Sequence, residues 1–347
     1  MMDLRKRYIY IITALLLFTG LNARGQDHLY SQYFNAPVYL NPALNGQFQG
    51  DFRANFNYRT QYTTSGSPSN YFTAEMDYNI PQFGGGVGLM FNRSSEGGQF
   101  LNTNSIAGIY SYSVGSDGYI LSFGIQAGVG NRNIDYSKLV FDDQIDPQLG
   151  IIPGASSAAD ALAFNNKYYF DTGAGINLVV GDFMIGGATQ HLNSPNDSFT
   201  GVPVKLPFRT TAYMTYRLDL DPDENMSDDE KSYLIPSVVY YRQSSSQSTA
   251  AGLEYKHRSV SAGLMYRSGG QSGPSALVLS LVFDLFVNRD SGEKFRLGVS
   301  HDALVSGLSY GGTSGSTEGS INYQTVNPNR VDTPPKFEGN THCYDFY

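Results

Sequence analysis

The chain has 347 residues, one cysteine and a formal net charge of −8. This acidity argues against binding to the phosphates of a nucleic acid, and the lone Cys343 excludes an internal disulfide. After residue 25 no apolar stretch approaches the ~20 residues of a transmembrane helix, so strands are the only means by which the chain could span a membrane.

Residues 1–25 have the organisation of a secretory signal peptide, with a basic start at residues 5–7, an apolar run at residues 9–18 and a small-x-small sequence at residues 23–25. The apolar run is too short to span a bilayer. We therefore expect cleavage before Gln26, and no lipid anchor because no cysteine stands at the cleavage site. Loss of a net charge of +3 would leave the mature chain near −11.

Residues 26–50 lack the alternation of a strand and contain prolines and asparagines that favour an ordered, non-helical segment. Their apolar side chains need burial, and the nearest apolar or aromatic wall is the mouth of a barrel formed by the strands that follow. We predict a periplasmic plug or latch that is either structural alone or also a docking surface. The candidate plug and partner-contact residues are Gln32, Tyr33, Phe34, Tyr39, Leu40, Asn41, Pro42, Asn45 and Gly46.

From residue 51 onward, apolar and polar residues alternate in fourteen stretches. A period of two produces a strand with one apolar face, and strands in lipid must close because an open edge cannot be hydrated there. We predict an all-β protein, an antiparallel transmembrane β-barrel of about 14 strands in the outer membrane, an even number as in bacterial single-chain barrels. Its domain covers residues 51–324, with strands near 51–64, 70–79, 84–95, 101–114, 118–132, 167–180, 182–191, 206–219, 232–243, 247–257, 259–268, 275–288, 294–302 and 316–324.

With both termini in the periplasm, the odd-numbered connections face outside. The longest of them, residues 133–166, then lies outside and includes a candidate short helix at residues 156–164. Residues 325–347 are predicted to be an irregular periplasmic tail because they are rich in proline. Cys343 in this tail is either an unpaired thiol or a cross-link to a partner.

The inward face of the predicted strands carries charges of both signs. Such charges can pair across the lumen and stiffen it, whereas an ion-selective filter would carry a ring of one sign. The candidate lumen charges are Arg53, Arg59, Glu75, Asp77, Arg209, Arg217, Glu254, Lys256, Arg267 and Arg296.

One connection on the predicted periplasmic side is long and acidic, at residues 220–231. Counted from Asp219, carboxylates fall at positions 1, 3, 5 and 12 of a calcium loop, but Glu224 occupies the sixth position, where the turn needs glycine. A solvated acidic turn fits better, and a contact for a basic partner stays open. The candidate residues are Asp221, Asp223, Glu224, Asp228, Asp229 and Glu230.

No catalytic or metal-binding arrangement stands out, because the five histidines are scattered and none has the spacing of a metal pair. We predict no enzyme activity, no cofactor and no bound metal. A lipid-acting hydrolase is the catalytic alternative, since some barrels are enzymes.

Residues 31–46 (Ser-Gln-Tyr-Phe-Asn-Ala-Pro-Val-Tyr-Leu-Asn-Pro-Ala-Leu-Asn-Gly) resemble the start of the PorP/SprF family of type IX secretion-associated outer-membrane proteins of Bacteroidetes. Residues 57–62 (Asn-Tyr-Arg-Thr-Gln-Tyr) look like that family's Asn-Tyr-Arg-x-Gln-Trp, with Tyr62 in place of Trp. The similarity runs from about Gln26 to Tyr323, with weaker matching pieces at residues 143–144, 236–237, 241–242 and 295–298.

The resemblance implies a non-catalytic role in type IX secretion or gliding motility. SprF-like members work with large exported adhesins that carry a C-terminal sorting domain, whereas PorP-like members serve the core machinery through periplasmic components or lipoproteins. We expect an outer-membrane anchor or export partner of an adhesin. The alternatives are a core-machinery barrel and a 14-stranded transporter of solutes or hydrophobic compounds, and a blocked lumen would favour the anchor.

Overall fold

The computed structural model describes residues 27–64, 66–80, 84–98, 100–116, 118–152, 166–198, 202–221, 231–269, 274–288, 293–306, 310–325 and 341–346, and every structural statement concerns these residues. The predicted signal peptide, the candidate helix at residues 156–164 and most of the acidic connection lie outside them. The strands of the main sheet are β1 (Phe52–Gln61), β2 (Ser69–Ile80), β3 (Gly85–Glu96), β4 (Leu101–Ser116), β5 (Tyr119–Ile134), β8 (Asn166–Val180), β9 (Phe183–Gln190), β10 (Arg209–Tyr216), β11 (Leu218–Asp219), β12 (Ser232–Gln243), β13 (Ser246–His257), β14 (Val260–Ser268), β15 (Ala276–Asn288), β16 (Glu293–Leu304) and β17 (Ser316–Thr325).

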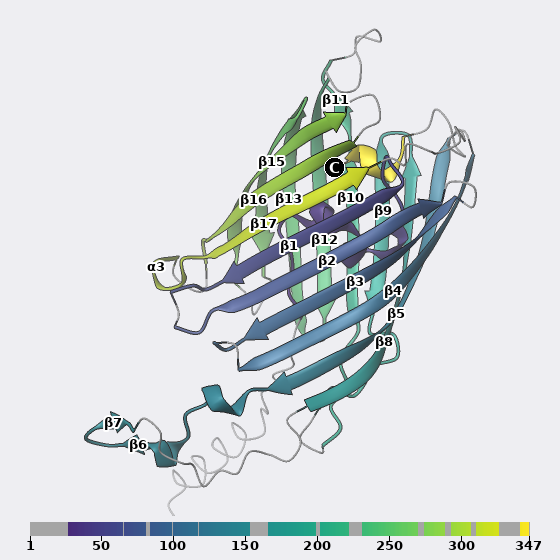
Figure 1. Ribbon diagram of the computed structural model, residues 1–347. Coiled ribbons are helices and arrows are strands. Elements are labelled where there is room, and N and C mark those ends of the chain that lie inside the picture. The colour runs from purple at the N-terminus through teal and green to yellow at the C-terminus, as the bar shows by residue number, and fades with distance from the viewer. Residues whose placement is uncertain are drawn as a thin grey trace, which may run out of the picture.

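These strands form one closed antiparallel barrel (Figure 1). Each strand pairs with its neighbour in the chain, β10 pairs with β12, and β1 closes the ring by pairing with β17 from Phe52 opposite Thr325 to Gln61 opposite Ser316. The two-residue β11 only extends the contact with β12. The predicted fourteen-stranded, all-β outer-membrane fold is confirmed. The sheet closes because closure pairs the backbone groups that an open edge would expose to lipid.

The barrel is apolar outside and polar inside. In β1 the inward side chains of Arg53, Asn55 and Arg59 are almost completely buried, while the outward Phe56 and Tyr58 are 37% and 51% exposed. This is the reverse of a water-soluble sheet, and it follows from lipid being the outer solvent. Among the described residues, no helix has the length and apolar character needed to cross a bilayer.

The two ends of the barrel differ. At one end, here called the loop-bearing end, long connections such as residues 135–165 and 191–208 join β5 to β8 and β9 to β10. The described part of the longer one holds the 3₁₀ turns η3 (Tyr136–Lys138) and η4 (Asp142–Gln144) and the small hairpin β6 (Ile145–Asp146) and β7 (Gly150–Ile151). The opposite, short-turn end has tight links such as residues 117–118 and 181–182, as expected of the periplasmic side.

Residues 27–50, the N-terminal segment, lie inside the lumen and not at its mouth. The segment forms the short helices η1 (Tyr33–Asn35), α2 (Pro37–Leu40) and η2 (Pro42–Leu44), whose residues are all buried. The sequence-based location was wrong because it considered only apolar contacts. The segment's backbone also needs hydrogen-bond partners, and the polar lumen wall supplies them.

The end of the chain also differs from the irregular tail that the sequence suggested. The 3₁₀ turn η5 (Cys343–Phe346) lies within the barrel at the short-turn end, where Figure 1 shows it in yellow beside the mark for the C-terminus. Cys343 and Phe346 are buried in an apolar cluster that includes Val179, Met184 and Leu40. These apolar side chains find there the burial that an extended periplasmic tail would deny them. Tyr310–Thr313 forms the remaining short helix, α3, at the loop-bearing end.

The outward face of β15 provides a test of membrane insertion. Leu281 lies near the middle of the strand and Val287 near its short-turn end, and both are exposed. Leu281→Arg should lower the free energy of unfolding by about 2–4 kcal/mol and Val287→Arg by about 0–1 kcal/mol, because the penalty for arginine depends on depth in the bilayer. Urea unfolding in lipid vesicles measures both. Equal losses would contradict this placement of the membrane.

Candidate functional site

The candidate site is the contact between the N-terminal segment and the inward side chains of the barrel. Its centre is a buried charge cluster at the seam where the first and last strands meet. Arg59 of β1 forms ion pairs with Asp302 of β16 at 2.5 Å and with Glu318 of β17 at 3.1 Å. Arg267 of β14 also pairs with Asp302, at 2.5 Å. Four side chains from four strands are thereby joined.

The N-terminal segment completes this cluster. The backbone N–H groups of Ser31 and Gln32 donate to the Glu318 carboxylate at 2.8 and 3.0 Å. The Ser31 hydroxyl donates to Asp302 at 2.7 Å and accepts hydrogen bonds from Arg59 and Arg267. Buried charges are tolerated only when they are paired and hydrogen-bonded, so the segment is part of what makes this cluster stable.

A third carboxylate holds the next turn of the segment. Glu75 of β2 accepts hydrogen bonds from the backbone N–H groups of Tyr39 at 2.6 Å and Val38 at 3.3 Å, and from the side chain of Asn55 at 3.0 Å. The first N–H groups of a helix have no partner within the helix. Glu75 supplies that partner for α2 and fixes its position against β2.

Asn41 connects the segment to the opposite wall. Its side-chain oxygen accepts from the Ala43 N–H at 2.9 Å and caps η2, while its amide donates to the Ile176 carbonyl at 2.9 Å and the Tyr213 hydroxyl at 3.0 Å. Tyr213 donates to Asn177 at 2.7 Å, and Asn177 donates to the Cys343 sulfur at 3.0 Å. A continuous chain of hydrogen bonds therefore joins the N-terminal segment to the C-terminal turn.

The last turn of the segment is held near the short-turn end. Gly46 donates its backbone N–H to Asp77 at 2.7 Å, and Arg53 pairs with Asp77 at 2.7 Å and donates to the Leu44 carbonyl at 3.2 Å. Gly46 has φ +69°, and a Cβ there would lie 2.8 Å from the Cα of Gly86. Only glycine meets both conditions without strain.

Glycines on the barrel wall follow the path of the segment. A Cβ on Gly86, Gly124, Gly175 or Gly298 would lie closer than 3.0 Å to atoms of Gly46, Pro42, Asn41 and Gln32, respectively. Glycine within a strand often marks a close approach of another backbone. The wall is thus shaped to the segment at several separate positions.

A charged junction holds the start of the segment at the loop-bearing end. Asp27 pairs with His191 at 2.7 Å and with Arg209 at 3.6 Å, and His191 also pairs with Asp171 at 2.9 Å. Burial opposes the charged imidazole, but attraction to Asp27 and hydrogen bonds to both carboxylates raise the pKa of His191 to about 9. At neutral pH His191 is therefore charged.

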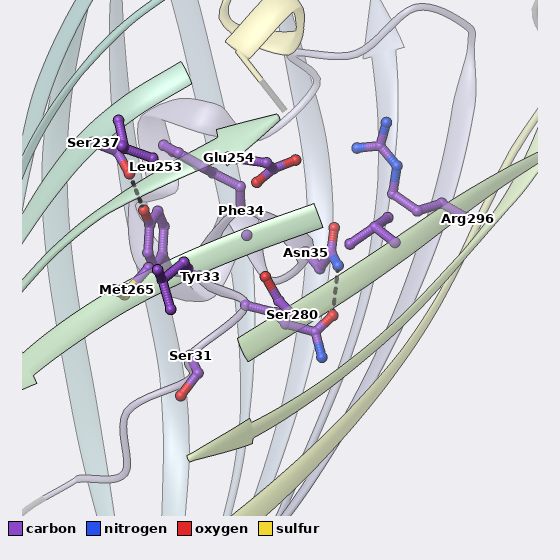
Figure 2. A pocket seen from close by; sticks show the side chains of 14 residues that line it. Ser31, Tyr33, Phe34, Asn35, Ser237, Leu253, Glu254, Met265, Ser280 and Arg296 are labelled. Atoms are coloured by element: carbon purple, nitrogen blue, oxygen red, sulfur yellow. Dashed lines mark hydrogen bonds between the residues drawn. The ribbon is translucent and has the colours of Figure 1, made fainter. Parts of the chain in front are cut away.

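A cavity of about 50 Å³ remains between η1 and strands β12–β16 (Figure 2). The Tyr33 hydroxyl shares a hydrogen bond with Ser237 on its wall, and Glu254 and Arg296 also line it. Arg296 pairs with Asp284 at 2.6 Å. The space suits a few water molecules, and it is too small for a solute of appreciable size.

The other predicted residues lie outside this contact. Arg217 pairs with Asp182 at 3.2 Å at the short-turn end, and Lys256 is half-buried on the inward face of β13. Asp221 accepts a hydrogen bond from the Ser232 N–H at 2.8 Å, whereas the remaining residues of the predicted acidic site are outside the described ranges. Within those ranges, no group of three or more His, Cys, Asp and Glu side chains is placed to hold a metal ion.

Sequence reasoning missed several residues of the site. Asp302 and Glu318 occupy inward positions of the last two strands, so the same alternation that selected Arg59 could have selected them. Asp27 and His191 lie outside the strands, where no pattern marks a lumen contact. Their pairing depends on the segment reaching the loop-bearing end.

The close fit of Gly124 against the segment can be tested with a single methyl group. In Gly124→Ala the new Cβ would meet backbone atoms of Pro42 and Ala43, which cannot rotate away. We expect a loss of about 1–3 kcal/mol from overpacking, seen as a lower temperature of unfolding on heat-modifiability gels. The matched control is Gly108→Ala on β4, where the new Cβ would have no atom within 4 Å other than those of its own residue and its chain neighbours. Equal behaviour of the two variants would refute the fit.

The junction at His191 predicts a dependence on pH. Because the folded pKa is raised, its stabilising effect is complete below the unfolded value of 6.5 and is lost as pH rises through about 9. Protease cleavage near residue 27 should therefore increase over this window. His191 has φ 60°, which asparagine tolerates, so His191→Asn should preserve the backbone and remove the transition. A transition that persists in His191→Asn would assign it to another group.

No curated protein matches the chain. Among solved structures, it is similar to a CymD monoaromatic hydrocarbon channel (11% identity, 89% of this chain and 96% of that chain, TM-score 0.48) and a TodX monoaromatic hydrocarbon channel mutant (11%, 83% and 92%, TM-score 0.42). It is also similar to a mutant Rh. blastica porin (8%, 79% and 97%, TM-score 0.30).

A family model described as "Type IX secretion system membrane protein PorP/SprF" matches residues 22–323. The match covers the N-terminal segment and nearly the whole barrel, which together form the site. The chain therefore belongs to the PorP/SprF family of type IX secretion system membrane proteins.

Proposed function

We propose that this protein is a non-catalytic outer-membrane anchor that holds a large cell-surface adhesin, or assists its export, through the adhesin's C-terminal sorting domain. The observation that carries the proposal is the fixed N-terminal segment within the lumen. Ser31 and Gln32 complete a buried cluster of two arginines and two carboxylates. A barrel filled in this way acts through its surfaces.

The energetics of the cluster support this proposal over transport. Withdrawing the segment would remove hydrogen bonds from Glu318, Asp302 and Glu75 while leaving their charges in the lumen. Leaving a buried acceptor without its hydrogen bond costs about 1–3 kcal/mol for each group. A transport cycle would have to supply that energy in every opening, whereas a rigid anchor never breaks these contacts.

The proposal assigns no chemical step to the protein. A partner would be bound by hydrogen bonds and apolar contacts on a preorganised surface, which lowers the entropy lost on association. The proposed partners are the surrounding lipid and an adhesin with a C-terminal sorting domain.

A second candidate role is a core secretion-machinery barrel linked to periplasmic components or lipoproteins. The connection between β10 and β12 favours it, because this connection is long although it belongs to the short-turn end. Its described residues Asp219 and Lys231 pair at 3.2 Å where the connection leaves and rejoins the barrel. A contact for a periplasmic partner would explain its length.

The test is purification of the tagged protein from its own outer membrane in mild detergent, followed by mass spectrometry. We expect an adhesin to co-purify and its isolated C-terminal domain to compete for the same binding. Co-purification of periplasmic proteins or lipoproteins alone would favour the machinery role. A protein that emerges alone and conducts solutes in planar bilayers would overturn the anchor proposal.

The control for this experiment is a variant of the acidic connection in which Asp223, Glu224, Asp228, Asp229 and Glu230 are changed to Asn or Gln. If the adhesin is the partner and binds elsewhere, its capture should be unchanged in this variant. If the connection holds a basic periplasmic partner, the capture of that partner should fall with rising salt in the wild type and be lost in the variant.

A further inference from the structure

The N-terminal segment begins at the loop-bearing end of the barrel. The backbone N–H of Asp27 donates to the side chain of Gln243 at 2.7 Å, and its carboxylate pairs with His191. Gln243 is the last residue of β12 and His191 directly follows β9, so both lie where these strands reach the loop-bearing end. The junction around Asp27 therefore marks one end of the path.

The segment ends at the opposite end of the barrel. The Asp51 N–H donates to the Thr325 carbonyl at 3.0 Å, and the Asn79 N–H donates to the Asp51 carbonyl at 2.8 Å. Thr325 is the last residue of β17 and Asn79 is next to the end of β2. Asp51 is therefore at the short-turn end, where β1 starts.

The contacts between these points begin near the loop-bearing end and finish near the short-turn end, although the Tyr39 carbonyl lies back toward the start and accepts hydrogen bonds from Gln190 and Arg209. Ser31 binds Glu318, which is close to the loop-bearing end of β17. Tyr39 binds Glu75 in the middle of β2, and Asn45 accepts from Ser111 nearer the short-turn end of β4 at 2.6 Å. The segment thus crosses the entire lumen, a height of about 25 Å in a typical barrel.

The C-terminal turn occupies the other end. Cys343 accepts its hydrogen bond from Asn177, three residues before the short-turn end of β8, and packs in the cluster with Val179 and Met184. The first and last described residues of the chain therefore lie at opposite ends of one barrel.

We infer that, once the signal peptide is cleaved as the sequence predicts, the amino terminus reaches the cell surface while the C-terminal turn stays at the periplasmic face. Long connections of outer-membrane barrels face outside and short turns face the periplasm, so the end at which Asp27 is held is the outer end. This inference is independent of which partner the barrel anchors.

An accessibility experiment on whole cells tests the inference. One variant carries an epitope tag between Gln26 and Asp27, and its matched control carries the same tag after Tyr347. We expect antibody binding to intact cells only for the first tag, and binding to the second only after the outer membrane is permeabilised. Heat-modifiability gels identify variants whose barrel has not folded.

A second variant with a smaller insertion avoids the possibility that a bulky tag disturbs the N-terminal segment. A single cysteine inserted between Gln26 and Asp27, in a Cys343→Ser background, should react on intact cells with a membrane-impermeant maleimide. Leu149→Cys in the same background is the control for the outer face, because Leu149 is 83% exposed in the longest connection. Labelling of Leu149→Cys without labelling of the inserted cysteine on intact cells would overturn the inference, as would surface labelling of the C-terminal tag.

Discussion

The structure depends on ion pairs and hydrogen bonds to the carboxylates of Asp302 and Glu318, whose negative charges are buried in the lumen. Arg59 of the first strand pairs with both, and they belong to the last two strands, so the cluster spans the seam that closes the barrel. The N–H groups of Ser31 and Gln32 are needed as well. Closure of the barrel and docking of the N-terminal segment are therefore coupled, and the barrel is formed around a segment that belongs to its core.

The same coupling explains the shape of the wall. A segment bound only by its charges could shift, but glycines such as Gly124 and Gly175 bring the wall backbone against Pro42 and Asn41. Hydrogen bonds then continue from Asn41 through Tyr213 and Asn177 to Cys343. The two terminal parts of the chain thus support each other inside the barrel. A lumen stabilised at both ends favours a scaffold whose outer surfaces do the binding.

Family membership and geometry address different questions. The PorP/SprF match covers residues 22–323 and assigns the chain to type IX secretion in the outer membrane. The geometry indicates how such a protein works. Lumen charges of both signs bind the N-terminal segment, and they do not form the ring of one sign that an ion-selective filter needs. Among the described residues, the junction at Asp27 and the C-terminal turn lie at opposite ends of the lumen.

The sequence by itself determined the closed fourteen-stranded barrel, because a period of two with one apolar face has a single solution in lipid. It also identified the inward positions of Arg59 and Glu75, since alternation fixes which face a side chain occupies. Only the tertiary structure decided what these charges bind. The path of residues 27–50 through the lumen depends on hydrogen bonds to distant strands, such as Ser31 with Glu318. No local pattern encodes a contact between residues so far apart in the chain, so the partner of each buried charge appears only when the barrel has closed.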